Sequence, residues 1–369
     1  MGAYHQGTER ETPCMSFANL HNADPPFSRA ISCRCSRIEC RTPLLLIRLK
    51  ESRDPRSHPL MNWKHGSELT SLDLLLLVIL AKMKNALSID LEDYYHVTAF
   101  AQEAGADDWQ SKKSRIEEST DKLLQQFSDA DCKATFFVLG WLVESKPALI
   151  RQIADLGHEI ACHSHKHRLV YEMTPDEFRE DTYRAKELLE EASGKAILGY
   201  RAPSFSIGEK SLWAFEILLE LGFTFDSSIF PVRHPNYGMP AAPRFPFLVC
   251  TPRGTIVEFP MPTVALGRRR SPIGGGAYLR LLPYWYTRWG IGFINSQEER
   301  PVCVYLHPWE LDTGQPRMRG SLTAHLRHYF GLRGTEAKLH KLLSDFEFGT
   351  LGSLIAECKG LQTALSVSV

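Results

Sequence analysis

Several features that would place a chain in a class at once are missing from these 369 residues. Neither charge is in excess, because lysine plus arginine and aspartate plus glutamate each number 43, so charge gives no argument for nucleic acid as a partner. The longest apolar run, residues 74–81, is far shorter than the roughly 20 residues of a membrane span, and no cleavage site clearly follows it. We therefore expect no membrane span and no export signal.

A cysteine framework is missing as well. Nine cysteines are an odd number, and five of them stand singly in apolar or mixed segments, which predicts reduced thiols and a cytosolic type of compartment. These five are Cys132, Cys162, Cys250, Cys303 and Cys358. The remaining composition, 43% hydrophobic and 23% charged, is typical of a globular protein.

The first 82 residues differ from the rest in composition and in periodicity. They are rich in arginine, proline, serine and cysteine and show neither helical nor strand periodicity. We interpret residues 1–82 as an irregular leader and expect that translation naturally starts near Met83. A structural zinc site on Cys33, Cys35 and Cys40 is a weak alternative, because their spacing matches no common zinc pattern.

After the leader, apolar strands alternate with amphipathic helices. Strands are predicted at 86–91, 134–139, 158–161, 197–200, 223–225, 256–261 and 302–306, and helices at 116–127, 147–156, 174–193 and 212–221. The third helix has a capping box of Thr174 and Glu177 at its start and Gly194 at its end. Repeated strand–helix units predict an α/β fold with a parallel sheet. Polar residues recur just after the strand ends, which favours closure into a barrel.

Two of the polar segments carry groups that bind metals. Asp90, Glu92 and Asp93 end an apolar strand, where ionised carboxylates are costly to desolvate without partners. His163 and His167 follow a later strand, and on a helical turn they would point the same way, as a zinc pair must. His165, which lies between them in the sequence, would face away into solvent.

Three further segments place single polar side chains after strands. Arg201 precedes a turn stiffened by Pro203 and is suited to orient a carboxylate. Asp226 follows a short strand, and the strand at 302–306 leads directly into His307 and, two residues later, Trp309. Each segment alone has an ordinary structural interpretation as a surface charge, a turn or core packing. Their order along one strand–helix chain is what indicates an active site.

Together these segments give the chain a specific resemblance. From about residue 84 to 355 it resembles the polysaccharide deacetylases of carbohydrate esterase family 4, the NodB-homology proteins, and in particular their branch associated with exosortase/PEP-CTERM exopolysaccharide clusters. The matching motifs are Asp-Leu-Glu-Asp-Tyr, His-Ser-His-Lys-His, Arg-Ala-Pro-Ser-Phe, Asp-Ser-Ser and His-Pro-Trp-Glu. The resemblance implies a distorted (β/α) barrel with a C-terminal extension. We therefore divide the chain into a NodB-like core at 83–228 and a family-specific region at 229–369 that includes His307.

The resemblance also implies a metal-dependent hydrolase that removes N-acetyl groups from a glycan. A divalent cation, best matched by Zn²⁺, would be bound by His163, His167 and a carboxylate. The family places two aspartates side by side, whereas here Leu91 follows Asp90, so the carboxylate ligand is either Glu92 or Asp93. We favour Glu92, because its longer side chain reaches further.

The remaining roles follow from the same resemblance. Asp90 would be the general base, oriented by Arg201, and His307 the general acid, with its tautomer fixed by Asp226. The tetrahedral oxyanion would bind the metal and a backbone N–H after Pro203. Leu306 and Trp309 would form the apolar pocket for the acetyl methyl group.

Two rival functions stay open at this stage. One is an amidohydrolase with the same fold acting on an amide that is not a glycan, and the other is a catalytically silent glycan-binding protein. The sugar, the polymer and the oligomeric state cannot be inferred from the sequence. We expect a cytoplasmic protein, with association with the cell envelope as the alternative.

Overall fold

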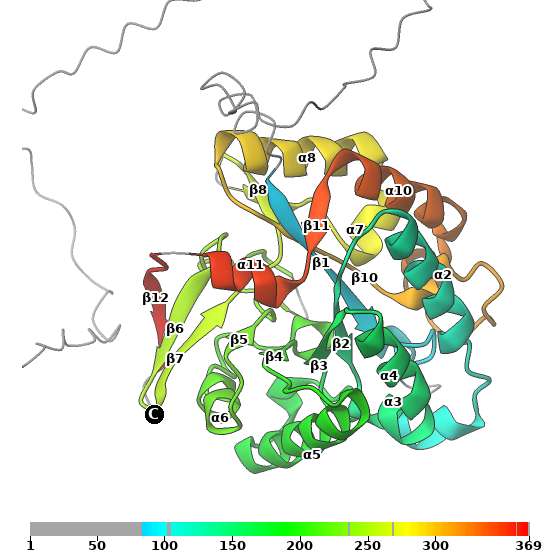
Figure 1. The fold of residues 1–369 in the computed structure, drawn as a ribbon, viewed down its shortest axis with the longest axis horizontal. Coiled ribbons are helices and arrows are strands. Elements are labelled where there is room, and N and C mark those ends of the chain that lie inside the picture. The colour runs from blue at the N-terminus through cyan, green and yellow to red at the C-terminus, as the bar shows by residue number, and fades with distance from the viewer. Residues whose placement is uncertain (1–82, 102–104, 235–236, 268, 359, 368–369) are drawn as a thin grey trace, which may run out of the picture. The chain divides into compact units, whose positions relative to one another are not determined.

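A computed structural model describes residues 83–101, 105–234, 237–267, 269–358 and 360–367 (Figure 1). The leader and the expectations placed on it, including the start at Met83 and the cysteine cluster, lie outside these ranges apart from Met83 itself. The strands are β1 (Lys84–Leu91), β2 (Thr135–Val138), β3 (Glu159–Cys162), β4 (Gly199–Tyr200), β5 (Phe225–Asp226), β6 (Phe247–Thr251), β7 (Gly254–Glu258), β8 (Thr263–Leu266), β9 (Arg269–Pro272), β10 (Cys303–Leu306), β11 (Glu347–Gly349) and β12 (Thr363–Ser366).

The helices are shared between the core and the C-terminal region. They are α2 (Ile116–Asp129), α3 (Gly140–Ser145), α4 (Pro147–Asp155), α5 (Pro175–Ser193), α6 (Ala214–Glu220), α7 (Gly276–Leu281), α8 (Tyr284–Gln297), α9 (Leu322–Tyr329), α10 (Leu332–Asp345) and α11 (Leu351–Glu357). Within the described ranges no helix is long and apolar enough to cross a membrane.

The main sheet confirms the predicted α/β class. Its strand order is β10-β1-β2-β3-β4-β5-β7-β6-β12, and β11 pairs with the start of β1. Every pair from β10 to β7 is parallel, whereas β6 and β7 form an antiparallel hairpin. The parallel part from β10 to β7 consists of the strands that the apolar runs predict. Parallel neighbours need a crossover connection, which is a helix between β3 and β4 and between β4 and β5, and the β6 segment between β5 and β7.

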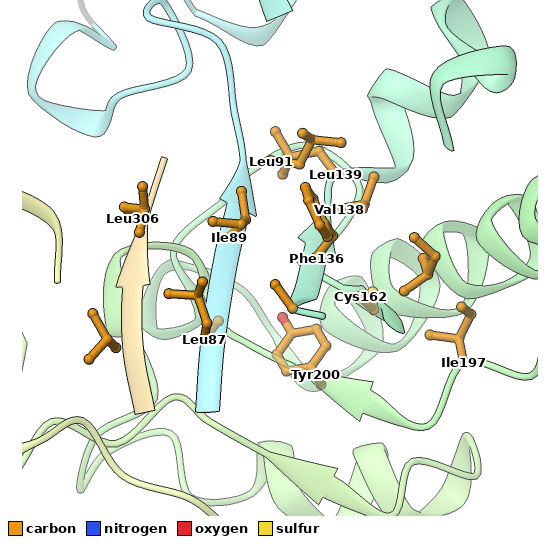
Figure 2. Close-up of a cluster of buried hydrophobic side chains, with 14 of the residues drawn as sticks. Leu87, Ile89, Leu91, Phe136, Val138, Leu139, Cys162, Ile197, Tyr200 and Leu306 are labelled. Carbon is orange, nitrogen blue, oxygen red and sulfur yellow. The ribbon is translucent and has the colours of Figure 1, made fainter. Parts of the chain in front are cut away.

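Both faces of the parallel sheet are buried, but by different side chains. On β1, Leu87, Ile89 and Leu91 point toward the covering helices and join a large apolar cluster (Figure 2). The alternate residues Ser88 and Asp90 point to the opposite face, because successive strand residues face opposite sides. The polar groups of the site therefore lie on the inner face, and the continuous apolar layer lies under the helices.

The sheet is curled into a distorted barrel around one arginine. Arg201 follows β4, and a flat sheet would hold β4 about 14 Å from β1, at roughly 4.8 Å per strand. Its Nη1 nevertheless lies 2.6 Å from Asp90 Oδ1, and its Nη2 lies 3.6 Å from Cys303 Sγ on β10. The strands must bend toward one another to bring these groups together, in agreement with the predicted barrel.

Local signals account for several element boundaries. The Thr174 side chain accepts a hydrogen bond from the backbone N–H of Glu177, and the Glu177 side chain accepts one from the backbone N–H of Thr174. Gly194 ends α5 with φ 68°, a left-handed conformation that favours glycine. The capping box and stop predicted from the sequence are thereby confirmed.

The C-terminal region covers one end of the site. The segment Pro308–Leu311, a short 3₁₀ helix after β10, packs against α2 and α10, and α7 packs against both α9 and α10. The sequence patterns predict none of α7 to α11, nor α3 in the core, and they do not reveal β6, β8, β9, β11 and β12.

Candidate metal and acid–base site

The predicted polar residues gather around one cavity of about 270 Å³ at the carboxyl ends of the parallel strands. Asp90, Glu92, His167 and His307 line it. Side chains of the C-terminal region complete its wall: His234, Tyr237, Ala277, Arg280, Ala324, Arg327 and His328. In α/β folds, ligands bind at this edge of the sheet, so the position is that of an active site.

Glu92, His163 and His167 form a group with the spacing of metal ligands. Glu92 Oε1 lies 3.0 Å from Nε2 of each histidine, and one ligand atom from each residue lies within 4.8 Å of the others. His163 Nδ1 lies 2.7 Å from the carbonyl oxygen of Arg201, a contact that requires the proton on Nδ1. The Nε2 lone pair of His163 is then directed at the carboxylate, as a metal ligand requires.

The two histidines come from a loop, and not from the helical turn that the sequence suggested. Ser164 and His167 have φ of 65° and 53°, so the chain turns through the left-handed region twice. The Ser164 hydroxyl accepts a hydrogen bond from the His167 N–H, and Asp181 on α5 accepts one from the His165 N–H at 2.7 Å. These side chains hold the loop in the shape that brings His163 and His167 together.

His165 is not exposed, contrary to expectation. Only 3% of it is accessible, and its ring packs so closely on α3 that a Cβ on Gly140 would come within 2.7 Å of Nδ1. Its Nε2 lies 3.7 Å from Glu144 on the same helix. Burial lowers the pKa of His165. The residue supports the loop from behind.

Of the two carboxylates considered as the metal ligand, Glu92 is the one that contacts the histidines. Asp93 points away and accepts hydrogen bonds from the Ser114 hydroxyl at 2.9 Å and the Arg115 N–H at 2.7 Å. Burial raises the pKa of Asp93. Burial would also raise the pKa of Glu92, but the charge of His167 and the close contacts with Nε2 of His163 and His167 outweigh it and hold that pKa well below its usual range. In this structure Glu92, the favoured candidate, has the position of a ligand, and the alternative candidate Asp93 is directed elsewhere.

Asp90 is held by Arg201, as predicted. Arg201 Nη1 donates to Asp90 Oδ1 at 2.6 Å and to Ser88 Oγ at 2.9 Å, and both ionised groups are buried. The guanidinium also donates to the carbonyl and hydroxyl of Ser227 and lies 4.0 Å from the Phe137 ring centre. Buried in this way, the ion pair fixes Asp90 as an oriented carboxylate.

His307 reaches the same cavity but has a different partner from the one expected. Its Nε2 lies 3.9 Å from Asp90 Oδ2, and its Nδ1 lies 2.6 Å from Glu310 Oε1. Arg280 Nε donates to the other oxygen of Glu310 at 3.1 Å. Burial lowers the pKa of His307, but the hydrogen bond to Glu310 and the charges of Glu92, Glu310 and Asp90 raise it to about 9.

Asp226, which we expected behind His307, has other partners. Its two oxygens accept hydrogen bonds from the N–H and the hydroxyl of Ser228. Burial and the proximity of Asp226 hold the pKa of Glu258 well above its usual range, and the pKa of Asp226 is itself raised by burial. The two carboxyl groups thus form a separate buried pair, and Glu310 is the residue that orients His307.

The expected substrate pocket is also revised. Leu306 is fully buried in the apolar cluster under the helices, because strand alternation turns Tyr305 to the cavity instead (Figure 2). Trp309 does line the cavity, where its ring stacks on His307 at 5.1 Å and on His328 at 4.2 Å. Pro203 is buried and the residues after it, Ser204 and Phe205, line the cavity.

Sequence analysis missed three residues around this site. Glu310 stood in the recognised His-Pro-Trp-Glu motif, three residues after His307, and that spacing was the available signal. No sequence signal pointed to Arg280, because it lies on α7, a helix that was not predicted. His96 is buried against Trp109 and Trp141, and its Nδ1 accepts from the Asp93 N–H at 3.0 Å. Burial lowers the pKa of His96 to about 3, so it stays neutral beside the three ligands.

Two family sequence models match consecutive parts of the chain. Residues 106–225 match "Polysaccharide deacetylase", and residues 227–356 match "Domain of unknown function (DUF3473)". The chain is 35% identical over 100 residues to the peptidoglycan-N-acetylglucosamine deacetylase of Bacillus cereus, and 32% identical over 108 residues to the peptidoglycan deacetylase of Helicobacter pylori. These alignments span 27% and 29% of this chain, and 36% of each relative. The chain thus spans about a third of the length of the curated relatives it matches.

Solved structures show more distant likeness. The peptidoglycan deacetylase PdaC from Bacillus subtilis aligns with a TM-score of 0.41 at 14% identity, covering 75% of this chain and 91% of that one. A family 4 carbohydrate esterase described as a pseudoenzyme, from Bacillus anthracis, aligns with a TM-score of 0.41 at 12% identity, covering 78% and 70%.

Proposed function

We propose that this chain, whose residues 106–225 are a polysaccharide deacetylase domain, is a metal-dependent hydrolase that removes N-acetyl groups from the sugar residues of a polysaccharide. One observation carries the proposal. A group of metal-type ligands, an oriented carboxylate and a histidine held by a buried carboxylate meet around a single cavity. Amide hydrolysis needs these three parts: an electrophilic centre, a base and an acid.

The ligand group suits a catalytic divalent ion. Glu92 and the Nε2 atoms of His163 and His167 would hold it, a set of two histidines and a carboxylate that leaves positions open. This donor set is best matched by zinc, and cobalt, manganese and iron are chemically compatible. An ion there would supply an activated water and polarise the amide carbonyl.

The protein's own groups would handle the protons. Asp90, oriented by Arg201, would take the proton of the attacking water. His307 keeps its proton at neutral pH, because Glu310 raises its pKa, and would donate it to the leaving nitrogen. Ser204 and Phe205, in the turn after Pro203, border the cavity on the side where the substrate carbonyl would lie.

The substrate class rests on the relatives. The curated proteins that match residues in the core are named as deacetylases of peptidoglycan or of its N-acetylglucosamine. An N-acetylated glycan is therefore the proposed substrate. Its assignment as an exopolysaccharide rests on the resemblance of the sequence motifs to the exopolysaccharide-associated branch.

Acetate release from N-acetylated oligosaccharides tests the proposal. We expect the zinc-loaded chain to release acetate and His163→Ala to lose both activity and bound metal. Asp90→Asn should retain metal and lose activity by a factor of about 10² to 10⁴. His340→Ala, a substitution of an exposed histidine, is the matched control. Metal binding without acetate release from any glycan would refute a glycan substrate and favour another amide.

A further inference from the structure

The C-terminal region builds a cationic side to the cavity, and from it we infer that Arg327 binds an anionic group of the glycan, a carboxylate or a phosphate, next to the N-acetyl sugar. The inference rests on the proposed function and names its substrate class more closely. Nothing in the two family descriptions assigns a role to this arginine.

Within the described residues, Arg327 is a cavity-lining cation without an acid partner. Two other cations line the cavity, Arg280 and His307, and both are paired with Glu310. Arg327 is exposed, and its side chain donates to the Tyr237 hydroxyl at 3.3 Å. Among the described residues it forms no ion pair, although arginine and carboxylate side chains pair elsewhere on this chain. Its guanidinium is thus available to a ligand in the cavity.

The acids that line the cavity are already engaged. Asp90 is paired with Arg201, Glu92 contacts the two histidines, and Glu310 is held between His307 and Arg280. None of these carboxylates is positioned by the structure to neutralise Arg327. A ligand that fills the cavity without an anion would therefore leave the guanidinium with only a neutral hydroxyl beside it.

Aromatic side chains cluster around Tyr237, the residue that Arg327 contacts. The Tyr237 ring stacks on His234 at 3.8 Å with an interplanar angle of 15°, and on its other neighbour Phe230 at 5.6 Å. The Tyr237 hydroxyl also lies 3.3 Å from the Tyr278 hydroxyl. Burial and the charge of Arg327 lower the pKa of His234, so its ring stays neutral. An aromatic face beside one forked cation is suited to a sugar ring that carries an acidic group.

The fold fixes the position of Arg327 through its backbone. Arg280 donates to the carbonyl oxygens of Arg327, His328 and Phe330, each at 2.9 Å, at the end of α9. These bonds satisfy terminal carbonyls and place a cation at the helix C-terminus. Because they involve only the main chain of Arg327, its side chain can be replaced without breaking them.

The test compares acidic and neutral N-acetylated oligosaccharides on the full, zinc-loaded chain. The acidic probes are N-acetylglucosamine 1-phosphate and a hyaluronan tetrasaccharide, which alternates N-acetylglucosamine with a uronic acid. The neutral probe is tetra-N-acetylchitotetraose, called chitotetraose below. The quantity measured is kcat/KM for acetate release, expressed as the ratio of each acidic probe to chitotetraose. We expect a ratio above one for at least one acidic probe and a fall of about tenfold in Arg327→Gln, the typical size of one charge-assisted hydrogen bond.

Two further variants sharpen the comparison. Arg327→Lys keeps the positive charge but loses the two-pronged guanidinium. Its ratio of acidic to neutral probe should therefore lie between those of the parent and Arg327→Gln. Arg333→Gln, at an exposed position on α10 that does not line the cavity, should keep the parent ratio. A preference for the uronic acid or for the phosphate identifies the anion, and either supports the inference. Equal use of acidic and neutral probes, or a ratio that Arg327→Gln leaves unchanged, overturns it.

Binding separates this inference from the proposed function. Calorimetry of the same probes needs no turnover, so it reports on Arg327 even if no probe releases acetate. In that case the proposed deacetylation fails, while an affinity for the acidic probe that drops about tenfold in Arg327→Gln still supports the anion subsite. Acetate release without any dependence on Arg327 supports the proposed deacetylation and overturns the anion subsite.

Discussion

Replacing Glu310 with glutamine should change the pH range in which the enzyme works. Glu310 is fully buried and its oxygens are divided between His307 Nδ1 at 2.6 Å and Arg280 Nε at 3.1 Å. Glutamine keeps the shape of the side chain but removes the negative charge. It can accept one hydrogen bond from His307, yet its amide nitrogen then faces the Arg280 guanidinium.

The expected shift can be worked from the hydrogen bond. A hydrogen bond to a charged group contributes about 1.5–3 kcal/mol, and one pKa unit corresponds to about 1.4 kcal/mol. The pKa of His307, raised to about 9, should therefore fall by about one to two units in Glu310→Gln. Because the general acid must be protonated, a lower pKa moves the alkaline limb of activity to lower pH.

The assay is the pH profile of kcat for acetate release, with thermal unfolding measured on the same samples. Unfolding is needed because Arg280 loses its carboxylate, and breaking a buried pair costs about 3–5 kcal/mol. Glu336→Gln, at an exposed site on α10, is the control. Asp226→Asn should leave the limb in place, since that residue contacts Ser228. A folded Glu310→Gln enzyme with the parent's alkaline limb, or a shift in Asp226→Asn instead, would refute this reasoning.

Three further outcomes follow from the geometry. Glu92→Gln should weaken zinc binding by at least about tenfold in a chelator competition, whereas Asp93→Asn should lower the unfolding temperature with little effect on zinc affinity. Glu258→Gln should flatten the dependence of the unfolding free energy on pH. The pKa of Glu258 is raised in the folded parent, so the parent loses stability as pH rises from the ordinary glutamate pKa to that raised pKa. Chemical denaturation at several pH values measures this loss. Gly275→Ala should destabilise the fold by about 2 kcal/mol or more, because φ is 94° and a Cβ would lie 2.1 Å from the Tyr305 ring; equal unfolding midpoints would contradict this.

Short-range signals in the sequence were enough to predict the core of the fold. The strands β2 and β10 are short, nearly continuous apolar runs, which is typical of strands buried on both faces, and β1 is a longer buried strand with few polar residues. The ends of α5 are also fixed by local signals. Its start is capped by Thr174 and Glu177, three positions apart, and its end by the single residue Gly194. The same locality explains the site: polar residues after parallel strands meet at one edge whatever the length of the crossovers.

Continuous apolar runs do not reveal which side chains face inward. In β10 every residue is buried, so the sequence could not distinguish the inward Tyr305 from the outward Leu306, and Leu306 was assigned to the wrong face. The prediction that His163 and His167 lie on a helical turn was wrong for a related reason. A spacing of four residues indicates a shared helical face only if the segment is helical, and Ser164 and His167 adopt left-handed conformations instead.

The site is built from both the core (83–228) and the C-terminal region (229–369), and this explains why the partner of His307 was misassigned. The core supplies Glu92, Asp90 and Arg201 from its own strand ends, so an interpretation that follows the core alone looks there for the partner and selects Asp226. In the structure the partner of His307 is Glu310, which is bound by Arg280 of the C-terminal region. Since Arg280 also binds the carbonyls that end α9, the histidine that would donate the proton and the arginine that would bind an anion depend on one buried guanidinium. Because Arg280 connects Glu310 to the main chain of Arg327, the C-terminal region contributes to the site itself and does not only enlarge the fold.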